Sequence, residues 1–180
     1  VLPGGGNYDQ VLAHELQHAI HWYVDPSEDT WINEGLAELS SSIALNSTFS
    51  IRHFLRSSPI SLINWPTSSV GGIANYGASS LFMHFFSEHY GGHDGLRILV
   101  AQPEDSIAGI NAYLEYMGYE SRFDDVFRAW AAANFLDGEG ILGYQDLEVS
   151  ATARKKIRGF NESNSEVPQY AVEYTELLPT

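Results

Sequence analysis

The segment His14-Glu15-Leu16-Gln17-His18 places two histidines four residues apart. On an α-helix, residues at this spacing lie about 40° apart around the axis and roughly 6 Å apart along it, so both imidazoles share one face. Imidazole nitrogens are common metal ligands, and two of them can converge on one ion. We therefore predict that His14 and His18 bind one metal ion, and that Glu15 beside them takes a proton from activated water.

Two further carboxylates follow on the next expected helix. Glu34 stands 16 positions after His18, beyond a turn at Pro26 that lets the chain double back, so it is the predicted third ligand. Glu38 lies one turn further on the same face and is predicted to hydrogen-bond a ligand imidazole, which fixes its tautomer. Gly35 lacks a side chain and is expected to let these two helices approach closely.

This donor set indicates a particular chemistry. Three ligands with nitrogen and carboxylate donors leave a fourth position for water, which is typical of catalytic rather than structural zinc sites. Zinc lowers the pKa of its water to about 7 and polarises a carbonyl, and Glu15 then carries the proton to the leaving amine. The residues predict one zinc ion and peptide-bond hydrolysis in a protein or peptide substrate. The competing interpretation is a solvated helix face that arose by chance.

The elements that must position these residues are mainly helical, because apolar residues recur at helical spacing through most of the chain. The first six predicted helices span about residues 7–24, 30–45, 48–56, 76–90, 94–102 and 106–117, and residues 57–75 form a long loop. A seventh is capped by Ser121 with Asp124 and ends at Gly138.

The periodicity fades after Asp137, and an alternating run near Tyr170, Val172 and Tyr174 predicts irregular structure or short strands. We expect residues 1–140 to form a helical catalytic domain. Residues 141–180 are expected to form an extension that packs on it.

Composition excludes several classes of protein. The 180 residues include 23 Asp and Glu against 9 Lys and Arg, a net charge of -14, which argues against binding to nucleic acid or to anionic membranes. No apolar stretch approaches the roughly 18 residues of a membrane span. Because there is no cysteine, a thiol nucleophile is excluded and any metal must be bound by His, Asp or Glu.

Other candidate groups have less specific patterns. His21 shares the face of His14 but lies about 10 Å along the helix from it, so we expect a buried, hydrogen-bonded histidine rather than a further ligand. Two acidic groups offer oxygen ligands for calcium, although solvated turns and helix caps would use the same residues. They are Asp25, Glu28 and Asp29, and separately Asp137 and Glu139.

Residues 14–18 (H-E-L-Q-H) followed by residues 31–38 (W-I-N-E-G-L-A-E) resemble the gluzincin metallopeptidases, which include thermolysin and the zinc aminopeptidases. Within this group the chain is most similar to the hyicolysin-like secreted bacterial proteases. The resemblance covers about residues 8 to 140 and extends less specifically to residues 75–82, 90–92 and 130–136. It implies a zinc-binding helix pair with a C-terminal helical lobe, and a secreted protein.

The resemblance also implies roles for individual residues. It makes His14, His18 and Glu34 the zinc ligands, Glu15 the general base and acid, and Tyr76 the donor that steadies the oxyanion. A structural role for Tyr76, as a core aromatic residue at the head of its helix, is the alternative. Gluzincins carry a β-sheet ahead of the first zinc helix, whereas here only six loop residues precede it, so that sheet is expected to be missing from this chain.

Two alternatives to an endopeptidase remain open. A zinc aminopeptidase would use the same ligands but needs an acidic group for the free amine of its substrate. A non-catalytic binding or adhesion module would keep the metal as a structural staple, but such a site has no need of Glu15 and tends to close its fourth position with a protein ligand. The sequence does not indicate the oligomeric state.

Overall fold

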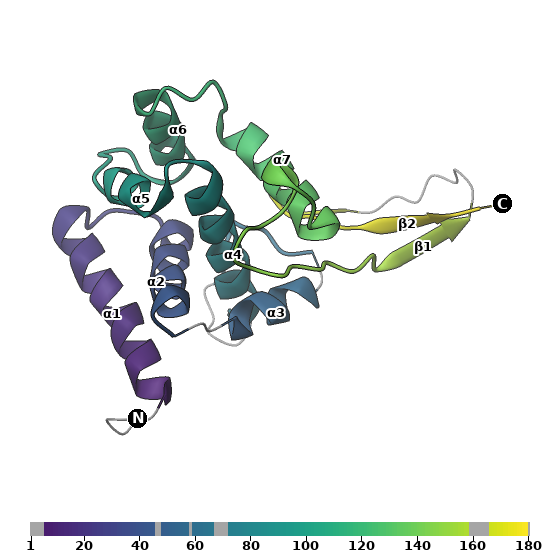
Figure 1. Cartoon of the computed structure of the whole chain (residues 1–180), viewed down its shortest axis with the longest axis horizontal. Helices are drawn as coiled ribbons and strands as arrows, with labels where there is room; N and C mark the ends of the chain where they lie inside the picture. Colours follow the sequence, from purple (N-terminus) through teal and green to yellow (C-terminus); the bar gives the residue numbers. More distant parts are fainter. Residues whose placement is uncertain (1–5, 46–47, 58, 67–71, 159–165, 180) are drawn as a thin grey trace.

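The computed structural model describes residues 6–45, 48–57, 59–66, 72–158 and 166–179. Within them the fold is mainly helical, as the sequence predicts, with a short two-stranded sheet near the C-terminus (Figure 1). In this part of the chain, no helix combines the length and apolar character needed to cross a bilayer. The α-helices are α1 (Gly6–Val24), α2 (Thr30–Leu45), α3 (Phe49–Leu55), α4 (Ile73–His89), α5 (Gly92–Val100), α6 (Ser106–Tyr116) and α7 (Phe123–Leu136).

Helix α4 is the centre of the fold, and α2, α3, α5 and α7 all contact it. Most of its residues are buried, small polar ones included, and Phe82, Phe85 and Phe86 have no exposed surface. Trp31 of α2 and Trp130 of α7 both meet Phe82 edge-on, with ring centroids 5.5 and 5.7 Å away. A helix that is buried on most sides is the central element of its fold, because neighbours must cover each of those faces. Helix α4 begins at Ile73, three residues before the predicted start.

Two glycines set how closely the helices pack. A Cβ on Gly77 of α4 would lie 2.0 Å from the carbonyl oxygen of Ser50, so α3 can approach α4 only because this side chain is missing. A Cβ on Gly35 of α2 would lie 3.0 Å from Met83 Cγ. Gly35 therefore faces α4, and the prediction that it lets the two metal-binding helices approach is wrong.

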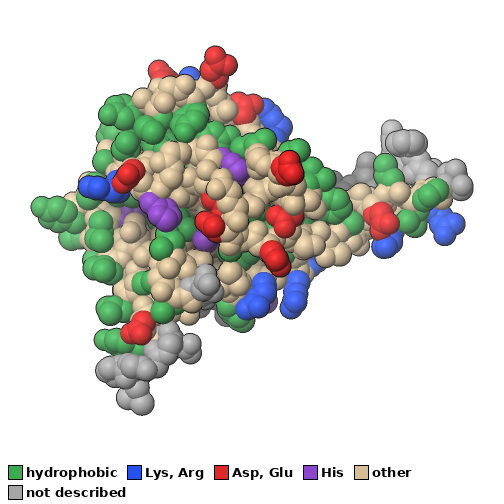
Figure 2. Space-filling view, viewed as in Figure 1, with side chains coloured by type: hydrophobic (Ala, Val, Ile, Leu, Met, Phe, Trp, Pro, Cys, Tyr) green, Lys and Arg blue, Asp and Glu red, His purple; other side chains and the backbone are tan. Residues whose placement is uncertain are grey.

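Helix α1 lies at the edge of the molecule and packs chiefly on α2 (Figure 1). The apolar residues at helical spacing on α1 are exposed, and Figure 2 shows hydrophobic side chains gathered along this edge. Their side chains are between 45 and 84 % exposed. They are Val11, Leu12, Leu16, Ile20, Trp22, Tyr23 and Val24.

The C-terminal segment has short strands, as expected, but one lies before the alternating run of residues 170–174 and the other begins just after it. Strands β1 (Lys155–Arg158) and β2 (Thr175–Leu178) pair in parallel, with Lys155 opposite Thr175. Before β2, the hydroxyl of Tyr174 donates to the carbonyl of Ala131 at 2.6 Å, which anchors the segment on α7.

The start of α7 differs from the prediction. Arg122 rather than Ser121 is the N-cap, and its backbone N–H donates to the Asp125 carboxylate at 3.0 Å. The same capping logic thus operates one residue later along the chain.

Candidate metal centre

Three side chains from two helices converge on one point. His14 and His18 lie on successive turns of α1, and Glu34 faces them from the first turns of α2. Their Nε2 atoms are 3.0 Å apart, and Glu34 Oε2 lies 3.2 Å from the first and 3.3 Å from the second. The helical spacing of the histidines and the turn before α2 together produce this triangle of potential ligand atoms.

The triangle fits a metal ion. Ligand atoms held tetrahedrally at about 2.0–2.2 Å from an ion lie about 3.3–3.6 Å from one another, so an outward shift of a few tenths of an ångström would suffice. Glu34 Oε2 is buried and has no hydrogen-bond partner in the described part of the chain, although two imidazole nitrogens face it. A buried carboxylate oxygen is costly unless a positive charge lies beside it, which a metal ion, or in its absence a proton on His14, can supply. His14, His18 and Glu34 are therefore positioned to bind a metal ion.

Glu38 lies behind His14. Its Oε1 is 3.4 Å from His14 Nδ1, and its Oε2 accepts a hydrogen bond of 2.6 Å from the hydroxyl of Ser50 in α3. With Nδ1 directed at a carboxylate, Nε2 is the nitrogen left to face an ion. Ser50 was not predicted, because only the approach of α3 to α4 at Gly77 brings it there.

Asn33 orients His18 as Glu38 orients His14. Its Oδ1 lies 2.8 Å from His18 Nδ1, so an Nδ1–H donates to the amide oxygen and Nε2 faces the centre. The sequence reasoning missed this residue. Its position next to Glu34, in the first turn of α2, is the one signal that could have indicated it.

The carboxylates shape the protonation of the site. Glu34, and next to it Glu38, raise the pKa of His14 to about 9 against the opposing effect of burial. Burial raises the pKa of Glu38, but its contacts with His14 and Ser50 outweigh this and lower the pKa below its ordinary value. The site thus concentrates negative charge around imidazoles, and a bound cation would take the place of the proton on His14.

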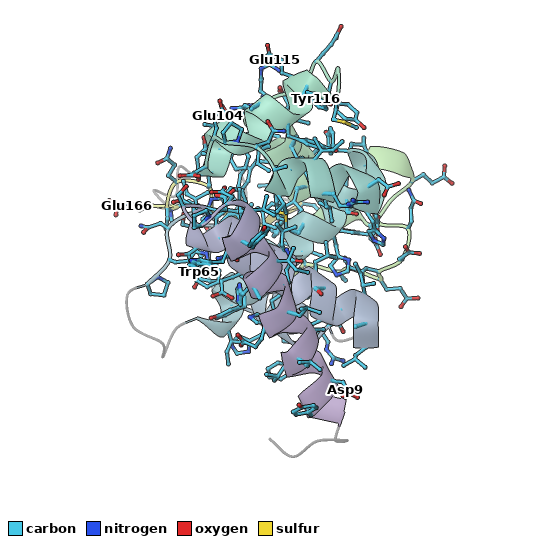
Figure 3. All side chains as sticks on the ribbon, turned by 90° about the vertical axis from the view of Figure 1, so that its left-hand side faces the viewer. Asp9, Trp65, Glu104, Glu115, Tyr116 and Glu166 are labelled. Carbon is cyan, nitrogen blue, oxygen red and sulfur yellow. The ribbon has the colours of Figure 1, made fainter. Side chains whose placement is uncertain are left out.

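A pocket of about 280 Å³ opens beside the ligand atoms, lined by His14, Glu15 and Tyr76 among others. Glu15 is exposed at its surface. The Tyr76 ring lies 6.3 Å from the His14 ring and is held edge-on by Trp65 at 4.8 Å. Trp65 lies to one side of α1 in Figure 3. Glu15 and Tyr76, the residues predicted to do chemistry, therefore share an open pocket with the ligand residue His14.

Burial raises the pKa of Tyr76, and the charges of Glu34 and Glu38 add to the effect. Its hydroxyl is therefore protonated at neutral pH and able to donate a hydrogen bond.

The two groups of candidate calcium ligands differ in whether the structure brings their members together. Asp25 and Glu28 lie together, but with His21 rather than with Asp29. Asp137 Oδ2 accepts a hydrogen bond of 3.1 Å from the backbone N–H of Val149, and in the described ranges neither this residue nor Glu139 belongs to a group of potential metal ligands.

Comparison of the chain with protein-family models and with curated proteins gave no match.

Proposed function

We propose that this chain is a zinc-dependent metallopeptidase, more specifically an endopeptidase. One observation carries the proposal: three ligand atoms of His14, His18 and Glu34 converge within 3.3 Å, while Glu15 and Tyr76 line an open pocket beside them. A metal site that opens on a pocket with a free carboxylate and a phenol has the parts needed for hydrolysis.

The donor set supports zinc. Two imidazole nitrogens and one carboxylate oxygen match the ligands of catalytic zinc sites, whereas calcium and magnesium prefer oxygen alone. Within the described residues no fourth His, Cys, Asp or Glu joins the group, so a coordination position is left for a small molecule. When bound, zinc would supply a Lewis acid that activates water and polarises a substrate carbonyl.

The chain's own residues would perform the proton transfers. Glu15 takes a proton from the attacking water and gives it to the nitrogen of the leaving amine, so the peptide bond breaks without a covalent intermediate. Tyr76 donates its hydroxyl proton in a hydrogen bond to the oxygen on which negative charge develops. Glu38 and Asn33 hold the two imidazoles so that their Nε2 atoms stay directed at one point.

The test separates metal binding from catalysis. Glu15→Gln should retain one equivalent of zinc and lose about 10²- to 10⁴-fold in the rate of cleavage of a denatured protein substrate, because the base is gone and the ligands remain. Glu104→Gln is the matched control, because this exposed glutamate lies far from Asp9, which marks the start of α1 in Figure 3. Cleavage by Glu15→Gln at the wild-type rate would show that the base is assigned wrongly.

The same preparation distinguishes the two kinds of peptidase and the non-catalytic alternative. An endopeptidase cleaves an N-acetylated peptide as well as its free counterpart, whereas an aminopeptidase fails on the blocked one. His14→Ala should lose the bound zinc while the exposed His53→Ala on α3 keeps it. Stoichiometric zinc without any chelator-sensitive cleavage by the wild-type chain would favour a structural metal.

A further inference from the structure

A second convergence of ligand atoms lies where α1 ends. His21, in the last turn of α1, meets Asp25 and Glu28 of the following turn, and one ligand atom from each lies within 4.8 Å of the others. His21 is seven residues from His14, or about 10 Å along the helix, so the two groups cannot share an ion.

His21 is the exceptional member of this group. Its side chain is 1 % exposed, yet neither ring nitrogen has a hydrogen-bond partner among the residues that the structure describes. The prediction that His21 is buried is therefore confirmed, whereas the prediction that it is hydrogen-bonded is wrong for the described residues. Burial lowers the pKa of His21, so the ring is neutral and one nitrogen keeps a free lone pair. Leaving such groups unsatisfied costs about 1–3 kcal/mol each, which a ligand on the lone pair would recover in part.

The two carboxylates are held in place through one oxygen each. Asp25 Oδ1 accepts from the backbone N–H and the hydroxyl of Ser27 at 3.1 and 3.0 Å. Glu28 Oε1 accepts from the backbone N–H groups of Asp29 and Ser106 at 2.6 and 2.8 Å. Among the described residues no hydrogen bond reaches the second oxygen of either carboxylate, so each is left for another ligand.

The charged groups that act on Glu28 are acidic. Burial raises its pKa to about 7, and the charges of Asp105 and Asp25 add to the effect. In the part of the chain that the structure describes, no lysine or arginine forms an ion pair with Asp25 or Glu28. Acids that crowd together around a free imidazole, without a basic partner, are stabilised by a divalent cation.

We propose that His21, Asp25 and Glu28 form a second metal site, which binds a divalent transition-metal ion of the zinc or manganese class. One imidazole nitrogen with two carboxylate oxygens suits such ions, whereas calcium prefers oxygen ligands alone. The ion would close the turn between α1 and α2. Because Glu28 also accepts from Ser106 at the start of α6, it would tie this turn to α6 as well.

The test counts metal ions in a chain that lacks the first site. The full-length His14→Ala/His18→Ala double variant should still bind one equivalent of Zn²⁺ or Co²⁺, with a Tm that rises with metal concentration. Adding Glu28→Gln should weaken this binding roughly tenfold or more, because a ligand charge is lost while the amide oxygen still accepts from Asp29 and Ser106. Asp29→Asn is the matched control, since it removes the same charge from an exposed neighbour outside the group.

Several results would overturn the proposal. They are no metal bound by the folded double variant, equal weakening by Asp29→Asn and Glu28→Gln, or Ca²⁺ bound as tightly as Zn²⁺. If the double variant does not fold, the wild-type chain serves instead. It should bind two equivalents of Zn²⁺, and its Glu28→Gln variant should bind one of the two ions roughly tenfold or more weakly. Unchanged affinity for both ions in that variant contradicts the site. No peptidase activity enters these measurements, so they fail or succeed independently of the proposed function.

Discussion

Ser50→Ala tests whether the third helix holds the metal centre together. The Ser50 hydroxyl is the donor to Glu38 Oε2 at 2.6 Å, and Glu38 in turn lies against His14 Nδ1. Alanine removes the donor and leaves the rest of α3 in place. We expect the Glu38 carboxylate to lose its fixed orientation and the His14 imidazole to turn more freely, so that the metal-free protein must order both before an ion can bind.

The size of the effect follows from the contact. Losing a partner that orients a metal ligand typically weakens metal binding about 10- to 100-fold, which corresponds to about 1.4 to 2.7 kcal/mol. A hydrogen bond to a charged group contributes about 1.5 to 3 kcal/mol to stability, so the metal-free protein should also unfold more easily. Ser50 is 9 % exposed, and water cannot readily replace its hydroxyl.

The assay is competition for Zn²⁺ against a chromogenic chelator, with thermal unfolding of the metal-free proteins alongside. Ser57→Ala is the control, because Ser57 follows the same helix and its hydroxyl donates at 2.7 Å to a backbone carbonyl rather than to Glu38. An affinity for Zn²⁺ within twofold of the wild type, in a Ser50→Ala protein that unfolds at a lower temperature, would refute the link from α3 to the metal centre.

Two further predictions concern packing and pH. Gly77→Ala should destabilise the fold by about 3 kcal/mol or more, because its Cβ would lie 2.0 Å from the backbone oxygen of Ser50. The measurement is urea unfolding, with Gly138→Ala as the control, because a Cβ there meets only ordinary contacts at 3.5 Å. Burial lowers the pKa of His84 to about 4 in the folded protein. As the pH falls from 6.5 towards 4, the unfolded chain takes up a proton on His84 that the folded protein does not, so the free energy of unfolding should fall. The difference in free energy of unfolding between wild type and His84→Gln should change by up to about 3 kcal/mol over that range, and a constant difference would contradict the shift.

Local patterns predicted the parts of this protein that depend on near neighbours in the chain. The bounds of α2 match the prediction because Thr30 starts the helix and its apolar residues at helical spacing continue to Leu45. The predicted convergence of the two histidines needs only the geometry of α1, and Glu34 needs only one turn in addition. The roles of Glu15 and Tyr76 stay predictions.

The rest depends on contacts that no local pattern encodes. Ser50 reaches Glu38 because α3 packs tightly on α4, and Gly35 faces α4 because the apolar side of α2 covers that helix. His21 is buried and, among the described residues, its ring nitrogens have no hydrogen-bond partner, although its spacing resembles that of any core histidine. Each of these positions is set by tertiary packing, which overrides the local preference.

The place of α1 at the edge of the molecule has a consequence for dynamics. A helix that packs chiefly on one neighbour and leaves much of its apolar side in solvent is a natural unit of local unfolding, with an opening free energy well below that of α4. His14 and His18 belong to α1 and Glu34 to α2, so an ion bound among them would have to be released before α1 could detach. Amide hydrogen exchange along α1 would then report metal occupancy directly, and the metal-free chain would exchange these amides long before those of the core.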